Sequence, residues 1–233
     1  MANRRARIHE FYSQPGRVIV GGTPAAASGY AYRGAGFWNT VVVRCDLNRY
    51  SAWARDKTIE QRVNLLNDFF STVVPLLEEH AGVYFRDEGD CIVSVFSGYF
   101  GLGATPERAR AFCQAVVSKT YGTDELSAKA VVAFGSVAYF QKSHEIGSDD
   151  WSAEGQPFVT AARLEQAIES RPHIVFFQEE YDQVFAQSAR VAAFGGRYYW
   201  EVESRSLQVP GLGLPGGWTD IFTLTHIPGG RIQ

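Results

Sequence analysis

Hydrophobic residues recur along this chain with two different spacings, and the alternation between them predicts its secondary structure. The β-branched run from Thr40 to Cys45 has the length and composition of a buried strand. From Thr58 to His80 the apolar residues return every three or four positions, and Gly82 follows as a stop signal. We therefore predict a strand followed by a long amphipathic helix.

The central part of the chain continues in the same way. Two short strand-like runs, Val83 to Arg86 and Cys91 to Phe96, flank the segment Asp87-Glu88-Gly89-Asp90, which suits a tight hairpin turn. We predict further helices from Pro106 to Lys119 and over 156–168, with strands over 128–134 and 136–140 between them. The order β, α, β, β, α, β predicts an α+β fold with a ferredoxin-like core, in which helices pack on one face of a mostly antiparallel sheet.

Composition indicates how the chain is divided into an arm and a domain. Residues 13–36 are rich in Gly, Ala, Ser and Pro, so we expect residues 1–36 to form an N-terminal arm and residues 37–233 to form one domain. With 233 residues, 45% of them hydrophobic, the chain has the profile of a globular protein with a single core.

Charge and cysteine content exclude several kinds of partner. The net charge of −3 provides no global positive field to attract nucleic acid or an acidic membrane, and no apolar run has the length of an export signal or a membrane span. Three cysteines without zinc-type spacing indicate reduced thiols. We expect a cytoplasmic protein that binds no nucleic acid.

Two aspartates are the strongest candidates for chemistry. Asp46 follows the predicted first strand, and Asp90 lies at the tip of the predicted hairpin. Strands of one sheet could bring both tips together, and two adjacent carboxylates need a cation between them. Such hard oxygen ligands suit Mg²⁺ or Mn²⁺ held beside substrate phosphates. Alternatively, Asp46 caps the following helix and Asp90 serves only the turn.

Three segments, in this order, resemble motifs of the class III adenylate and guanylate cyclases. The first runs from Val41 to Ser51 and contains Asp46; the second comprises 76–82 and the Glu88-Gly89-Asp90 turn; the third runs from Gly155 to Glu165. The resemblance spans roughly residues 38–224. It implies the fold of a class III cyclase catalytic domain and cyclisation of a nucleoside triphosphate, in which the 3′-hydroxyl attacks the α-phosphate and pyrophosphate leaves.

The resemblance also assigns roles to residues around the first metal motif. Asp46 and Asp90 would hold two divalent ions, Mg²⁺ or Mn²⁺, and the backbone carbonyl of Leu47 would complete the metal shell. The turn that follows would cradle phosphate oxygens through the backbone N–H groups of its residues, Asn48, Arg49 and Ser51 among them.

In the third motif, the resemblance makes Arg163 the residue that stabilises the transition state. It would reach the α-phosphate from the partner subunit, so that a homodimer is required. The alternative is an exposed helix residue paired with Glu165 or Glu169.

Departures from the family pattern bear on the choice of base. Arg86 stands where the family has a lysine, Ser152 where it has an aspartate, and Tyr50 at its aromatic position. A guanidinium only donates hydrogen bonds, and uracil offers two carbonyl acceptors where cytosine offers one and an amine. The combination resembles the pyrimidine cyclases of bacterial Pycsar anti-phage defence, which make cyclic UMP or cyclic CMP for a co-encoded effector protein. We favour UTP, with CTP as the alternative; Arg86 and Tyr50 could also be packing residues.

Two further departures concern the phosphates and the ribose. Val159 replaces an asparagine and Pro210 replaces a phosphate-binding lysine, whose charge Arg44, Arg49 or Arg197 could supply. A nucleotide sensor without catalysis and a purely structural dimerisation module are therefore the alternative functions.

Overall fold

The computed structural model describes residues 30–97, 105–121, 127–144, 149–182, 199–213 and 215–227. The elements follow in the order β1 (Tyr30–Leu47), α2 (Tyr50–Trp53), η1 (Ala54–Asp56), α3 (Ile59–Glu79), β2 (Val83–Glu88), β3 (Cys91–Ser97), α4 (Thr105–Thr120), β4 (Ala128–His144), β5 (Asp149–Glu154), α5 (Gln156–Ala167), β6 (His173–Phe177), α6 (Gln178–Glu180), β7 (Tyr199–Gln208), η4 (Pro215–Gly217) and β8 (Trp218–Ile227).

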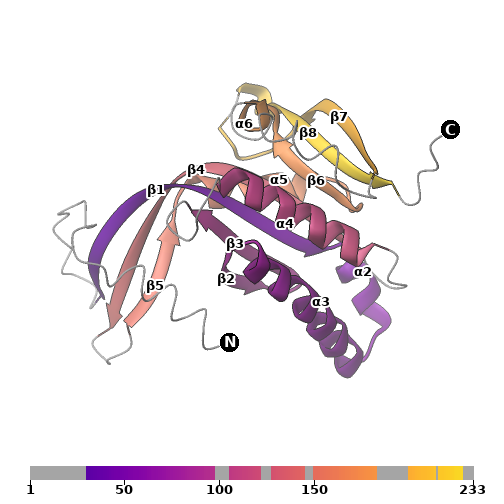
Figure 1. Ribbon diagram of the computed structural model, residues 1–233, viewed down its shortest axis with the longest axis horizontal. Helices are drawn as coiled ribbons and strands as arrows, with labels where there is room; N and C mark the ends of the chain where they lie inside the picture. Colours follow the sequence, from indigo (N-terminus) through magenta and orange to yellow (C-terminus); the bar gives the residue numbers. More distant parts are fainter. Residues whose placement is uncertain are drawn as a thin grey trace.

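The strands form one eight-stranded sheet with the order β2-β3-β1-β4-β6-β8-β7, and β5 pairs with β4 beside this path. Every pair is antiparallel except β4 with β6, which α5 connects as a crossover. The four strands β2, β3, β1 and β4 have the order of a ferredoxin-like core (Figure 1). The predicted α+β fold with a mostly antiparallel sheet is confirmed.

Alternate residues of β1 divide the hydrophobic core between the two faces of the sheet. Val41 and Val43 pack in one cluster with residues of α3 and α4, whereas Val42 packs in a second cluster with Ala161 and Leu164 of α5. Our prediction of helices on one face therefore holds for α3 and α4 but is wrong for α5, which covers the opposite face. Because this part of β1 is buried on both faces, its sequence is a continuous apolar run and does not alternate between apolar and polar residues.

The boundaries of several elements differ from the sequence prediction. Strand β1 begins at Tyr30, opposite His144 of β4, so residues 30–36 of the expected arm are part of the sheet. Residues 1–29 lie outside the described part of the chain. The two strands predicted over 128–140 are one strand, β4, that continues through Gly135. The outer parts of β1 and β4, with β5, extend to one side of the helical body (Figure 1).

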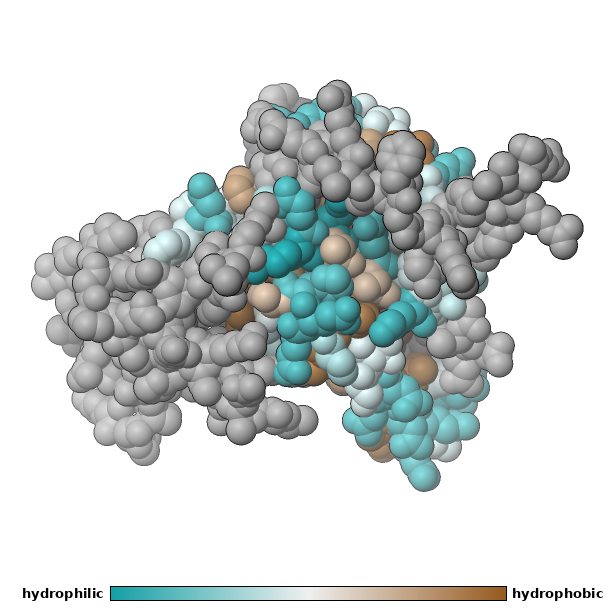
Figure 2. Space-filling model, viewed as in Figure 1, coloured by the Kyte–Doolittle hydropathy of each residue, from teal (hydrophilic) through white to brown (hydrophobic). Residues whose placement is uncertain are grey.

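The surface is mainly hydrophilic on the face shown, and the cysteines lie in the interior. On the face shown in Figure 2, hydrophilic side chains cover most of the described surface, with hydrophobic ones scattered between them. No helix in the described residues is long and apolar enough to cross a bilayer. The three cysteines, Cys45, Cys91 and Cys113, are buried and free, as predicted.

Candidate active site

The sheet brings the two candidate metal ligands together. Asp46 near the end of β1 lies opposite Cys91 at the start of β3, and Asp90 immediately precedes Cys91 in the β2–β3 turn. The carboxyl groups of Asp46 and Asp90 are close enough to influence each other's ionisation. The end of the strand and the tip of the hairpin therefore lie side by side, as the sequence predicts.

Burial makes this pair of carboxylates electrostatically costly. It raises the pKa of Asp46 to about 7, against the opposing effect of Lys129, and the neighbouring carboxylates Asp90 and Glu165 raise the pKa further. Burial likewise raises the pKa of Asp90. Two buried, adjacent carboxylates resist ionising together unless a cation lies beside them. The site therefore favours binding of positive charge.

The donor set fits a hard divalent cation held in part by its substrate. Two carboxylates and the backbone carbonyl of Leu47 at the end of β1 are oxygen donors of the kind that Mg²⁺ and Mn²⁺ prefer. The described residues contain no cluster of three or more His, Cys, Asp or Glu side chains that could form a closed metal cage. Two carboxylates and one carbonyl would fill only part of the coordination shell of such an ion.

A chain of ion pairs, which the sequence did not reveal, supports Asp46. Lys129 Nζ lies 3.1 Å from Asp46 Oδ2 and 3.0 Å from Glu165 Oε1. Arg44 lies beyond it, with Nη2 at 3.3 Å from Glu165 Oε2 and Nη1 at 2.9 Å from Glu88 Oε2. The only sequence signal was a charged residue inside each of two apolar strands. Because Arg44 is buried and doubly paired, it is not available to replace the missing phosphate lysine.

The turn after Asp46 presents only part of the expected phosphate cradle. The backbone N–H of Asn48 donates to the Ser127 carbonyl at 2.8 Å, and its side-chain amide donates to Ser127 Oγ at 2.9 Å. Asn48 is therefore engaged with the neighbouring segment in this structure. Arg49 adopts a left-handed backbone conformation (φ 62°) that turns the chain into α2, and Arg49 and Ser51 are both exposed.

The three candidate base-binding residues lie on different elements. Tyr50 is half-buried and contacts Trp53, with 5.9 Å between ring centroids. Arg86 on β2 has a side chain that is 54% exposed and pairs with Glu88 at 2.6 Å. Ser152 lies on β5, and its side chain is outside the described part of the structure.

Arg163 is exposed on α5 and lies against the loop that follows β7. Gly211 in this loop has φ +84°, and a Cβ added there would lie 3.2 Å from Arg163 Nε, so glycine allows the close approach. Pro210, at the position of the family's lysine, precedes Gly211 and is exposed. The structure thus places Arg163 beside the loop that contains Pro210 and Gly211. Arg197 lies outside the described residues.

Neither glutamate that offered an alternative role for Arg163 is paired with it in the described structure. Glu165 contacts Lys129 and Arg44, and Glu169 pairs with Arg171. Residues two positions apart on a helix point in nearly opposite directions. Because Glu165 faces Lys129, Arg163 points away from the aspartates of its own subunit.

Gly155 fixes where α5 begins. A Cβ on Gly155 would lie 2.6 Å from the Ser136 carbonyl oxygen, so only glycine allows this contact between α5 and β4. Val159, one turn into α5, is 47% exposed and offers no hydrogen bond to a ribose. Val159 and Arg163 are both exposed on α5.

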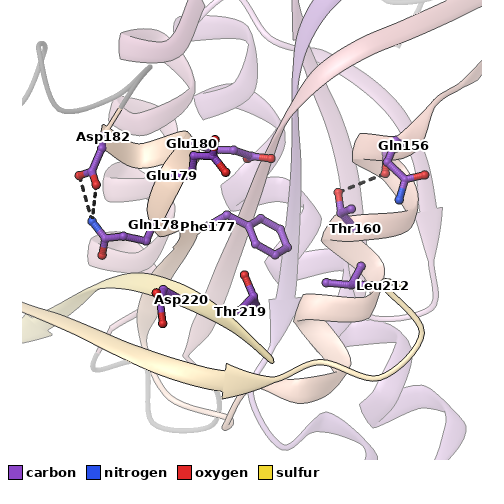
Figure 3. Close-up of a pocket in the computed structure, with 10 residues that line it drawn as sticks. All are labelled: Gln156, Thr160, Phe177, Gln178, Glu179, Glu180, Asp182, Leu212, Thr219 and Asp220. Atoms are coloured by element: carbon purple, nitrogen blue, oxygen red, sulfur yellow. Dashed lines mark hydrogen bonds between the residues drawn. The ribbon is translucent and has the colours of Figure 1, made fainter. Parts of the chain in front are cut away.

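A cavity of about 720 Å³ opens beside α5 (Figure 3). Its lining includes Gln156 and Thr160 of α5 together with four carboxylates, Glu179, Glu180, Asp182 and Asp220. Burial raises the pKa of Glu180 to about 7, and its carboxylate accepts the Phe134 N–H at 2.8 Å. Four carboxylates repel a triphosphate, and none of the metal or transition-state candidates is among the lining residues of this cavity.

Comparison by sequence finds no match: no family model matches the chain, and no curated protein matches it either. Comparison by structure finds many. The adenylyl cyclase CyaB from P. aeruginosa matches with a TM-score of 0.62 and 15% identity over 83% of this chain and 96% of that one. The guanylate cyclase domain of RhGC from Catenaria anguillulae, solved with GTP, matches with a TM-score of 0.64 and 14% identity over 82% and 98%.

A third similar structure is described as a non-canonical dimeric guanylyl cyclase domain from Blastocladiella emersonii. It matches with a TM-score of 0.61 and 14% identity over 83% of this chain and 98% of that one. Identities this low show the fold and not the activity. The chain has the fold of class III cyclase catalytic domains.

Proposed function

We propose that this protein is a nucleotidyl cyclase that works as a homodimer and converts UTP to 3′,5′-cyclic UMP and pyrophosphate. The observation that carries this proposal is the meeting of Asp46 and Asp90, two partly buried carboxylates, at one point of a cyclase fold. A structural dimerisation module has no use for such a destabilising pair, whereas an enzyme that binds a metal–triphosphate complex does.

Asp46, Asp90 and the Leu47 carbonyl are the groups that would hold two Mg²⁺ or Mn²⁺ ions. When bound, these ions would activate the 3′-hydroxyl and neutralise phosphate charge. The protein's own task is to align the 3′-hydroxyl with the α-phosphate, because no covalent intermediate with the enzyme is required. Lys129 fixes the Asp46 carboxylate by its 3.1 Å ion pair, which leaves the second carboxylate oxygen for the ion. Exposed Arg49 and Ser51 follow directly and are placed to contact the phosphates.

The second half of the site would come from the partner subunit. Arg163 points away from its own aspartates, and it is exposed on α5 beside the Gly211 loop. Its guanidinium would stabilise the charge that develops on the α-phosphate as pyrophosphate leaves. A structure with this fold is described as a non-canonical dimeric guanylyl cyclase domain, which supports the ability of the fold to form a dimer. Two chains would form two equivalent sites.

Recognition of the base is assigned to Arg86, Ser152 and Tyr50. A guanidinium has five N–H donors, and uracil presents two carbonyl acceptors. Half-exposed Arg86 uses a donor on Glu88 and keeps others for a ligand. CTP is the second candidate because a serine hydroxyl can serve either base. By its resemblance to the Pycsar pyrimidine cyclases, the protein would make a second messenger that activates an anti-phage effector.

The decisive experiment incubates the purified protein with Mn²⁺ and each of the four ribonucleoside triphosphates, followed by mass analysis of the products. We expect cyclic UMP from UTP, and loss of at least about 100-fold in rate for Asp46→Asn and Asp90→Asn. If only ATP or GTP is cyclised, the protein is a cyclase but the assignment of a pyrimidine base is wrong. Binding without release of pyrophosphate from any triphosphate would instead identify a nucleotide sensor.

A further inference from the structure

One carboxylate, Glu88, joins the candidate base-reading residue to the interior of the protein. Its Oε1 lies 2.6 Å from Arg86 Nη2, and its Oε2 lies 2.9 Å from Arg44 Nη1. The two oxygens of one side chain thus hold two guanidinium groups. Glu88 ends β2, two residues after Arg86 and two before Asp90.

The inner guanidinium is the fixed end of this bridge. The Arg44 side chain is only 8% exposed, and it also pairs with Glu165 at 3.3 Å. A buried guanidinium has to keep its partners, because an unpaired charge in the interior is strongly destabilising. Arg44 therefore holds the Glu88 carboxylate in one orientation.

The outer guanidinium is held but not covered. Arg86 lies with Cζ 5.3 Å from the centroid of the Phe85 ring, and its side chain is 54% exposed. The pairing of β2 with β3 shifts register between Tyr84 and Arg86, and such a bulge re-aims the side chain that follows it. Glu88 and the Phe85 ring thus restrain a long side chain that would otherwise sample many rotamers.

We infer that Glu88 is a positioning residue for base selection: it orients Arg86 toward the base without touching the base itself. This inference rests on the proposed function, since it takes Arg86 as the base reader. The bridge continues from Arg44 through Glu165 and Lys129 to Asp46, so the base-reading end and the metal-binding end belong to one ion-pair chain. Discrimination between bases requires the N–H donors of Arg86 to be held in a fixed position, because a mobile guanidinium can adapt to either pyrimidine.

The test compares Glu88→Gln and Glu88→Asp with the wild type. The first keeps the shape and removes the charge; the second keeps the charge and shortens the reach. Glu169→Gln is the matched control, because Glu169 also pairs with two arginines, Arg171 and Arg205, but lies outside the site. For each protein, the ratio of kcat/KM for UTP to that for CTP is measured, with the metal concentration at half-maximal rate. The affinities for both triphosphates are measured by calorimetry in Ca²⁺ buffer.

We expect the UTP to CTP ratio to change by about threefold to tenfold in both Glu88 variants, the effect of losing one charge-assisted hydrogen bond. The ratio in Glu169→Gln should stay within about twofold of the wild type. A merely structural role would lower both rates equally and leave the ratio unchanged, which would overturn the inference. Melting temperatures identify variants that are simply unfolded, and Glu88→Asp then carries the test.

Failure of the proposed function gives a different result. If the wild type binds triphosphates but cyclises none, the cyclase proposal fails, and the calorimetric ratio still decides the role of Glu88. If the wild type prefers a purine, the same comparison is made between that purine and UTP. If no triphosphate binds, both proposals are wrong.

Discussion

At the scale of single residues, this protein contains charges that folding alone does not favour. The structure keeps Asp46 and Asp90 adjacent and partly buried, and Lys129 compensates part of their charge. Sites where local energetics are unfavourable tend to be functional sites. The aspartate pair is therefore a better guide to function than any single motif residue.

Replacing one of these aspartates should separate stability from activity. In metal-free buffer at pH 8, we expect Asp90→Asn to be as stable as the wild type or more stable, by up to about 1 kcal/mol, because it removes a like-charge contact. The same variant should lose cyclase activity. Urea unfolding monitored by circular dichroism measures the first effect. A marked loss of stability would show that the Asp90 carboxylate serves the turn instead.

A second buried group predicts the acid sensitivity of the fold. Burial lowers the pKa of His173, only 2% exposed, from 6.5 to about 4, and the Nε2 atom has no partner among the described residues. The neutral imidazole therefore contributes stability that is present above pH 6.5 and is lost as the pH falls toward 4. His173→Gln, which cannot titrate, should reduce the loss of unfolding free energy between pH 8 and pH 4.5 by roughly 2–3 kcal/mol. Parallel pH profiles for the two proteins would contradict this.

At the scale of elements, local sequence signals set the ends of helices with little help from the fold. Thr58 Oγ1 accepts the Gln61 N–H at 3.2 Å, and the Gln61 side chain accepts the Thr58 N–H at 2.9 Å, which forms a capping box. Helix α3 then carries the apolar face that packs on β1 and β3. The four residues from Thr58 to Gln61 thus determine where this helix begins.

Thr58→Ala should lower stability by about 1 kcal/mol and the melting temperature by roughly 2–4 °C, because one of the first N–H groups of α3 loses its acceptor. Thr72→Ala is the matched control on the same helix: Thr72 Oγ1 only donates to the Asp68 carbonyl one turn back, at an exposed position. Differential scanning calorimetry of both variants distinguishes a capping role from a general threonine effect. Equal melting temperatures for the two would contradict the capping role.

Across the whole molecule, the residues of the proposed site lie on two separate parts of one subunit. The aspartates lie on the edge formed by β1 and the β2–β3 turn, whereas Arg163 projects from α5 beside the Gly211 loop. Catalysis as proposed needs the aspartates of one chain and the arginine of the other. Subunit mixing tests this directly.

Asp46→Asn and Arg163→Ala should each be inactive alone, yet their mixture should recover roughly a quarter of wild-type activity. Random exchange makes half of the dimers mixed, and each mixed dimer has one intact site of two. The control is a mixture of Asp46→Asn with Asp90→Asn, which should stay inactive because both changes damage the same half-site. Recovery in the control, or none in the first mixture, would exclude the shared site.

Local sequence signals predict the elements with strong periodicity, from the strand before Asp46 to α5, and the order of the ferredoxin-like core. They also predict that Asp46 ends a strand and Asp90 ends a hairpin, because turn chemistry and apolar period are local properties. From these features alone, the two aspartates are expected to lie near each other.

The pairing of charges, in contrast, depends on the folded chain. Lys129 reaches Asp46 and Glu165, and Arg44 reaches Glu88 and Glu165, across separations that no local pattern records. The glycine- and alanine-rich residues 30–36 likewise become a strand because β4 supplies their hydrogen-bond partners. Period and turn preference arise from neighbours in the chain, whereas ion pairs and sheet pairing arise from contacts between distant segments, which form only when the chain folds.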